Sequence, residues 1–140
     1  MKLSLRMMEA FLIDQTQQMS DAGMDSVIDR PVAEILQQRF QVDLADVAAL
    51  CDRFRIVEMG IFGSALRDDF RSDGDDPSDV DLLVTFATGD RLSYEEFLDL
   101  RDAAMALFGR EVDICQKELI DNPYRRAKIL RSTQVIYAAQ

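Results

Sequence analysis

The stretch "IFGSALRDDFRSDGDDPSDVDLLVTF", residues 61–86, decides the fold prediction for this chain. It opens on the end of an apolar run, turns at Gly63 and Ser64, crosses a loop rich in aspartate, and closes on a second apolar run. Apolar, β-branched segments bounded by glycine, proline and aspartate are typical of buried strands. The stretch therefore predicts two strands, over residues 56–62 and 79–86, joined by a long acidic loop.

Three helices are predicted ahead of the first strand. The first lies near the N-terminus, with Leu5, Met8 and Leu12 as its inner stripe. The second has Pro31 at its first position, where the missing N–H costs nothing. The third begins at Asp43, a residue type that caps helix N-termini. Its apolar face is formed by Leu44, Val47, Ala48 and Cys51.

Capping residues also order the chain after the second strand. Ser93 and Glu96 form a capping box, and Gly109 ends the helix that they start. Three more elements follow: a short strand over residues 111–115, a helix that starts at Asp121 or Asn122 before Pro123, and an edge strand over residues 134–139. This order predicts a small α/β (α+β) domain in which helices pack on a sheet.

Composition limits the setting and the partners. The 140 residues are 48% hydrophobic, which fits one domain with a real core. No apolar run approaches the roughly 18 residues of a membrane span, and the N-terminus lacks the features of a signal peptide. Cys51 and Cys115 lie in apolar segments and are interpreted as small buried thiols, so a cytoplasmic setting is expected. The net charge of −10 disfavours direct binding of nucleic acid.

The absence of histidine narrows the chemistry. It excludes Ser-His and Cys-His catalysis as well as zinc held by histidine. Two distant cysteines do not make a Cys-x-x-Cys metal site either. Carboxylates are the titratable groups that remain, and their hard oxygen atoms suit magnesium, manganese or calcium.

Asp79 and Asp81 are the strongest candidates among the many aspartates. They stand two residues apart on a predicted strand, so both carboxylates project from one face while Val80 and Leu82 point into the core. Such a pair can bridge two divalent cations, the arrangement of two-metal phosphoryl chemistry. Asp-x-Asp triplets also arise by chance, and the second one, Asp73 with Asp75, is interpreted as a solvated turn.

Two further features accompany this pair. Gly63 lets the backbone approach a phosphate closely, and the Ser64 hydroxyl can donate to its oxygen atoms, although Gly-Ser is more often a simple turn. Asp113 stands between Val112 and Ile114 on a short strand. It is either a salt-bridged or edge residue, or a third carboxylate that the sheet brings beside the other two.

Basic residues gather late in the chain, at Lys117, Arg125, Arg126, Lys128 and Arg131. The simpler interpretation is a solvated helix face. The alternative is a surface that meets a ligand carrying phosphate or an acidic partner.

The combination of Gly-Ser, Asp-x-Asp on an apolar strand and a later strand aspartate resembles the minimal nucleotidyltransferases of the DNA polymerase β-like superfamily. The family pattern has ten residues between Gly-Ser and Asp-x-Asp, whereas fourteen separate Ser64 from Asp79 here. The excess falls around "SDGD", residues 72–75, where a loop absorbs it cheaply. The resemblance implies a polymerase β-like fold, with a nucleotidyltransferase domain over residues 43–140. Residues 1–42 form an N-terminal helical extension that it does not explain.

The resemblance also implies roles for individual residues. Gly63, Ser64 and Arg67 would bind the nucleotide phosphates. Asp79 and Asp81 would hold two Mg²⁺ ions, with Mn²⁺ as an alternative. Asp113 would complete the catalytic metal site and help to deprotonate the attacking hydroxyl.

By the same resemblance, the expected activity is Mg²⁺-dependent transfer of a nucleoside monophosphate, AMP from ATP, to a hydroxyl on a partner protein. Stand-alone members resemble antitoxins whose partner is a HEPN-domain ribonuclease toxin, which they bind and AMPylate. A hetero-oligomer with such a toxin is therefore expected. The alternative is a non-catalytic antitoxin of the same fold that neutralises its partner by occlusion.

Overall fold

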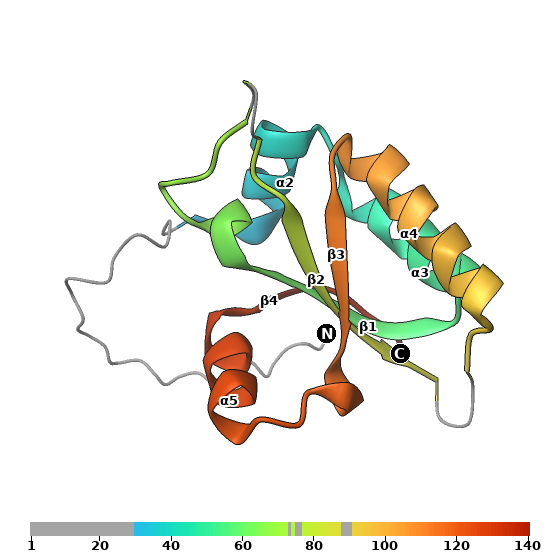
Figure 1. Ribbon diagram of the computed structural model, residues 1–140. Coiled ribbons are helices and arrows are strands. Elements are labelled where there is room, and N and C mark those ends of the chain that lie inside the picture. The colour runs from blue at the N-terminus through green and yellow to red at the C-terminus, as the bar shows by residue number, and fades with distance from the viewer. Residues whose placement is uncertain (1–29, 73, 75–76, 88–90) are drawn as a thin grey trace.

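The computed structural model describes residues 30–72, 74, 77–87 and 91–140. Within these residues four α-helices surround a four-stranded sheet, which confirms the predicted fold class (Figure 1). The helices are α2 (Val32–Phe40), α3 (Leu44–Arg53), α4 (Tyr94–Phe108) and α5 (Pro123–Ser132). The strands are β1 (Ile56–Phe62), β2 (Val80–Phe86), β3 (Val112–Gln116) and β4 (Gln134–Ala138), and short 3₁₀ turns cover Gly63–Leu66 and Lys117–Leu119. The helix predicted around Leu5 lies outside the described residues.

The strands follow the order β3-β2-β1-β4. β1 pairs antiparallel with β2 and with β4, while β2 and β3 are parallel. Parallel neighbours need a long crossover, and α4 supplies it between β2 and β3. The two most apolar strands are therefore central, and β4 lies at an edge, as predicted.

The sheet separates two apolar clusters. The larger one joins α2, α3 and α4 to one face, which includes Val80, Leu82 and Val84 of β2. The smaller one packs Leu83 against Ile129 of α5 and Ile120 on the other face (Figure 1). Because side chains alternate along a strand, Asp81 shares its face with Leu83 and lies on the α5 side. The sequence pattern of β2 thus directs its carboxylate away from the larger core.

The predicted capping signals are confirmed. Asp43 and Ser93 each form a capping box, with Asp46 and Glu96 respectively. Gly109 ends α4 in the left-handed conformation, with φ 73°. The side chain of Asn122 accepts hydrogen bonds from the first backbone amides of α5. Because these signals act within one helical turn, they can be read from local sequence.

Small differences appear at element ends. Pro31 is the N-cap of α2 and not its first helical residue. Leu44, predicted on the inner face of α3, is 43% exposed, whereas Leu50 is buried. Leu44 is the first helical residue, so it projects beyond the sheet at the end of the helix. β2 begins at Val80, which leaves Asp79 just before the strand.

Residues 32–42 pack into the same core as the rest of the described chain. Ile35, Leu36, Phe40 and Val42 all belong to the larger cluster. Cys51 is fully buried there, and burial raises the pKa of its thiol to about 12. Cys115 is only half-buried. Among the described residues, none of the helices combines the length and the apolar character that crossing a membrane requires.

Candidate active site

Asp81 and Asp113 are register partners on the parallel strands β2 and β3. Asp81 is half-buried, whereas Asp113 and Asp79 are exposed. Parallel neighbours bring the equivalent ends of two strands to the same edge of a sheet. The topology therefore gathers the three carboxylates that the sequence singled out, although Asp113 is thirty-two positions from Asp81 in the chain.

The neighbouring carboxylates act on the protonation of Asp81. Burial raises the pKa of its carboxyl, and the charges of Asp113 and then Asp79 raise it further. Arg67 and Arg125 oppose the shift. Ionised carboxylates that destabilise one another in this way are stabilised by a cation between them.

The donor set fits a hard divalent ion, because all three groups are carboxylates at one edge. As the side chains stand in the described ranges, no cluster of three or more His, Cys, Asp or Glu residues is arranged as a finished metal site. The fit therefore rests on donor chemistry and on the mutual repulsion at Asp81.

The Gly63–Ser64 turn lies against this edge. Phe62, the last residue of β1, is the register partner of Asp81, so the turn that follows stands beside the carboxylate. Gly63 has φ +78°, a conformation that side chains rarely adopt, and a Cβ there would overlap Oδ2 of Asp81. Glycine at this position thus permits both the turn and the close approach of the carboxylate.

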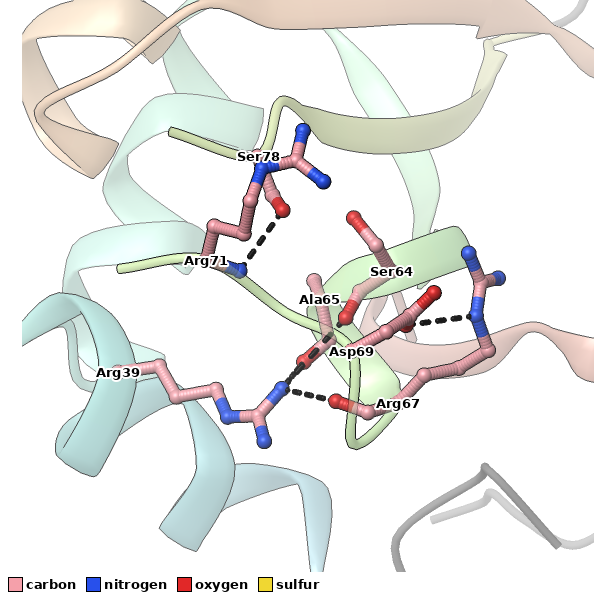
Figure 2. A network of polar contacts seen from close by, with 7 residues as sticks. All are labelled: Arg39, Ser64, Ala65, Arg67, Asp69, Arg71 and Ser78. Atoms are coloured by element: carbon pink, nitrogen blue, oxygen red, sulfur yellow. Dashed lines mark hydrogen bonds and ion pairs between the residues drawn. The ribbon is translucent and has the colours of Figure 1, made fainter. Parts of the chain in front are cut away.

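A cavity of about 320 Å³ opens between the turn and the carboxylates. Its lining residues are Ser64, Arg67, Asp69, Arg71, Pro77, Ser78, Asp79 and Asp81. Arg67 is held there by an ion pair from its Nε to Oδ1 of Asp69, at 3.1 Å (Figure 2). Four of the six predicted site residues line the cavity, Gly63 packs against Asp81, and Asp113 is the strand neighbour of Asp81.

The long loop is closed at its base. The backbone amide of Ser78 donates to the Arg71 carbonyl at 2.9 Å. The amide of Arg71 donates to the Ser78 hydroxyl at 2.8 Å (Figure 2). Arg110 reinforces this closure by donating to the carbonyls of Arg71, Ser72 and Ser78. The loop therefore has a closed neck at Arg71 and Ser78, and the turn at Ser64 stays beside Asp81. The predicted solvated turn at Asp73 and Asp75 falls outside the described residues.

A larger cavity, of about 500 Å³, lies near the opposite end of β2. Thr85, Phe86, Gln116 and Glu118 are among its lining residues, and none of the predicted site residues is. With a single carboxylate in its lining, it offers no cluster of metal ligands. Size alone would have selected this cavity, whereas the chemistry of the side chains selects the smaller one.

The sequence and the fold of this chain are similar to those of known proteins. The sequence profile of the family described as "Nucleotidyltransferase domain" matches residues 47–136, which is well over half of the chain. The chain belongs to this nucleotidyltransferase family. The match includes the Gly63–Ser64 turn and all three carboxylates, and it begins after α2.

Curated relatives of this nucleotidyltransferase carry more specific names. It is 34% identical to the protein adenylyltransferase MntA of Thermococcus cleftensis over 88 residues, which are 63% of this chain and 80% of that protein. It is 30% identical over 80 residues to a Methanocaldococcus jannaschii protein whose assignment as a protein adenylyltransferase is provisional. That match covers 57% of this chain and 76% of the relative.

Solved structures of similar fold include one provisionally described as a minimal nucleotidyltransferase. It has a TM-score of 0.54 and 32% identity, and the match covers 73% of this chain and 93% of that one. A toxin–antitoxin complex with AMP-PNP shares the fold with a TM-score of 0.50 at 16% identity, over 71% of this chain and 76% of that one. These matches confirm the polymerase β-like fold prediction.

The structure also brings Arg125 to the candidate site. It stands in the first turn of α5, where its charge lowers the pKa of Asp81. It also lies at Cys115, whose pKa is raised by burial and by Asp113, while a hydrogen bond from Arg125 opposes that shift. Sequence analysis had placed this arginine only in the late basic cluster. Its position in the first turn of a helix that starts at Asn122-Pro123 was the available signal.

The other members of that cluster behave differently. Arg126 donates to the carbonyl of Lys117, and Lys117 forms an ion pair with Glu58. Lys128 and Arg131 are exposed on α5. Of these five residues, only Arg125 acts on the pKa of Asp81. A role of the cluster in meeting a phosphate-bearing ligand or an acidic partner stays a prediction.

Proposed function

We propose that this protein transfers AMP from ATP to a hydroxyl group on a partner protein and serves as the antitoxin of a HEPN-domain ribonuclease toxin. The observation that carries the proposal is the strand register of Asp81 and Asp113 beside the Gly63–Ser64 turn. Membership of the nucleotidyltransferase family supports the reaction class. The names of the relatives support AMP as the transferred group.

The phosphate side of the site consists of Ser64 and Arg67. Both line the cavity beside Asp79 and Asp81, so a triphosphate bound there lies close to the carboxylates. The Ser64 hydroxyl donates to a phosphate oxygen, and the Arg67 guanidinium offers charge and a planar pair of donors. Asp69 orients Arg67 in advance of binding.

The carboxylates form the reacting side. Asp79, Asp81 and Asp113 would hold two Mg²⁺ ions, with Mn²⁺ as an alternative, and such ions neutralise charge on the attacking and leaving oxygen atoms. Asp113, exposed at the edge, is placed to accept the proton of an incoming hydroxyl at its carboxylate oxygen. Arg125 opposes the rise in the pKa of the Asp81 carboxyl and so favours the ionised form that binds a metal ion.

The partner is proposed from the neighbours of this chain. A solved complex of MntA is described as a toxin–antitoxin assembly, and another toxin–antitoxin structure of similar fold holds AMP-PNP. The candidate site lies at the edge of the sheet, open to a second protein. In this proposal the toxin presents the hydroxyl. A cytoplasmic setting, where ATP and an RNase target coexist, is part of the proposal.

The test uses the protein with MgATP, labelled in the adenine, and a HEPN-domain toxin encoded beside it. We expect labelled AMP on the toxin and loss of its RNase activity. Magnesium with ATP should also raise the melting temperature of the protein alone, because ligands that bind the folded state stabilise it.

A double variant separates catalysis from occlusion. Asp79→Asn with Asp81→Asn should abolish transfer, while Asp99→Asn with Asp102→Asn, two exposed carboxylates on α4, should leave it intact. If the first variant still neutralises the toxin and the wild-type protein transfers no AMP, the occlusion alternative replaces the enzymatic one.

A further inference from the structure

Arg39 of α2 reaches across to the turn that carries Ser64. Its Nη1 donates to the carbonyl of Ala65 at 2.9 Å and to the carbonyl of Arg67 at 2.7 Å, and it lies 3.5 Å from the Ser64 carbonyl (Figure 2). The two short contacts are good hydrogen bonds, and the third is at the limit. One guanidinium group thus contacts carbonyl groups within the 3₁₀ turn and directly after it.

The turn depends on such a donor. A 3₁₀ segment of four residues, Gly63–Leu66, has few internal hydrogen bonds, and its last carbonyls need partners from outside. Ala65 and Leu66 are buried, so water does not replace Arg39 freely. Removing the guanidinium would take this donor from the buried Ala65 carbonyl, next to Ser64, whereas the Ser64 and Arg67 carbonyls keep backbone donors.

Arg39 is itself held in place. Its guanidinium carbon lies 4.7 Å from the centre of the Phe70 ring. Arg110 lies 4.8 Å from the same ring, while it binds the carbonyls at the neck of the loop. Phe40, next to Arg39 in α2, packs edge-on against Phe70 at 5.3 Å. One aromatic residue therefore links the arginine at the turn to the arginine at the neck.

We propose that Arg39 is a positioning residue for the nucleotide site, which fixes the Gly63–Ser64 turn against Asp81 from outside the residues that the family profile matches. Arg39 precedes the matched residues 47–136, so this role belongs to the N-terminal segment of this chain. The proposal rests on the proposed nucleotidyl transfer for its consequence. The holding of the turn is a separate property that can be measured without nucleotide.

Arginine suits this role better than lysine. Its planar, rigid guanidinium fixes the direction of the two N–H bonds of Nη1 toward neighbouring carbonyls while its face packs on an aromatic ring. A lysine would supply charge and donors on a flexible stem. Arg39→Lys should therefore give a partial defect, and Arg39→Met, which keeps the apolar stem, should give the full one.

Hydrogen–deuterium exchange of the free protein tests whether Arg39 holds the Gly63–Ser64 turn in place. In Arg39→Met, the amides of residues 63–70 should exchange at least roughly tenfold faster than in the wild type, since local opening becomes easier. The matched control is Arg53→Met on α3. The guanidinium of Arg53 also lies 4.7 Å from an aromatic ring, that of Phe54, but it makes no hydrogen bond to the turn among those of the described residues. This control should not change exchange at residues 63–70.

Nucleotide affinity and steady-state kinetics test the consequence. At a temperature where all variants are folded, Arg39→Met should weaken MgATP binding and lower kcat/KM by roughly 10- to 100-fold. Arg39→Lys should fall between it and the wild type. A merely structural role would lower the melting temperature alone, so unchanged affinity and kinetics in folded Arg39→Met would overturn the proposal.

The outcomes are distinguishable from failure of the proposed function. If the wild-type protein binds no MgATP, the proposed function fails, and with it the consequence for nucleotide binding; the exchange data still decide whether Arg39 holds the turn. If exchange at residues 63–70 is the same in Arg39→Met and Arg53→Met, Arg39 does not hold the turn, whatever the protein binds.

Discussion

The carboxylate of Asp81 lies directly against the backbone of Gly63. A Cβ at Gly63 would overlap Oδ2 of Asp81 and lie 3.2 Å from its carboxyl carbon. The strand that ends at Phe62 and the strand that starts at Val80 therefore meet at a point where only a glycine fits. The candidate phosphate turn and the candidate metal ligand share this contact, so a change at one displaces the other.

Gly63→Ala should inactivate the protein. The substitution forces alanine into a φ of +78° and pushes the Asp81 side chain away, at a cost of about 1–3 kcal/mol in stability. Gly109→Ala is the matched control, because φ is +73° there and no heavy atom lies within 4 Å of the added Cβ. We expect AMP transfer to survive Gly109→Ala alone. Equal activity in the two variants would show that the contact with Asp81 does not matter.

Asp81→Asn should stabilise the free protein while it abolishes transfer. Burial and the charges of Asp113 and Asp79 raise the pKa of the Asp81 carboxyl, so the folded chain holds that proton more tightly than the unfolded chain. This contribution to stability is present at acid pH and is lost as the pH rises above about 4. At neutral pH, removal of the charge should raise Tm by about 2–4 °C, as thermal unfolding in the absence of divalent ions would show.

The exposed Asp99 on α4 provides the control for this effect. Asp99→Asn removes one negative charge with no carboxylate neighbour in the site, and it should leave Tm nearly unchanged. A gain in Tm of the same size in both variants would attribute the effect to the net charge of −10 and not to the local repulsion.

Deletion of residues 74–77, which also removes Pro77 from the turn, should leave an active protein. Arg71 and Ser78 already close the neck, and after the deletion their backbone hydrogen bond would join residues i and i+3 of a β-turn. The spacer between Ser64 and Asp79 would then have ten residues, as the family pattern has. We expect transfer activity within about threefold of the wild type, since shortening a surface loop changes stability little.

Ser78→Ala should be more harmful than that deletion. Ser78 is 2% exposed, and its hydroxyl accepts from the Arg71 amide. Loss of this acceptor removes a part-buried hydrogen bond from the neck and should cost about 0.5–1.5 kcal/mol in the free energy of unfolding. The exposed Ser72 is the control, and Ser72→Ala should behave as the wild type in denaturant titrations.

Arg125→Met should slow transfer by roughly tenfold. The loss of one electrostatic contact to a reacting group typically costs at least this much in rate. Without this guanidinium, the pKa of Asp81 rises further, so the acid limb of the pH–rate profile should move to higher pH. Lys128→Met, which removes an exposed charge from the same helix, should shift neither the rate nor the profile. An unchanged acid limb in Arg125→Met would remove Arg125 from the site.

Local sequence predicts most of the elements. Asp43, Ser93, Gly109 and Asn122 act within one turn of their own helix, and the apolar runs of β1 and β2 are buried on both faces, so each signal is read without knowledge of the fold. Leu44 was placed wrongly because burial at a helix end depends on what the helix packs against. The 3₁₀ turn at Gly63–Leu66 also escaped prediction, since its carbonyls are held by Arg39 from a distant helix.

By itself, the sequence determined the residue types of the site: a glycine before a serine, two aspartates at alternating positions, and no histidine that could offer other chemistry. Only the tertiary structure decided which groups meet. The parallel register of β2 and β3 places Asp113 beside Asp81, and the packing of α2 and α5 brings Arg39 to the turn and Arg125 to the carboxylates. The reason is physical: periodicity along a chain sets the face on which a side chain lies, whereas its neighbours across the sheet depend on strand order and helix packing, which contacts distant in sequence create.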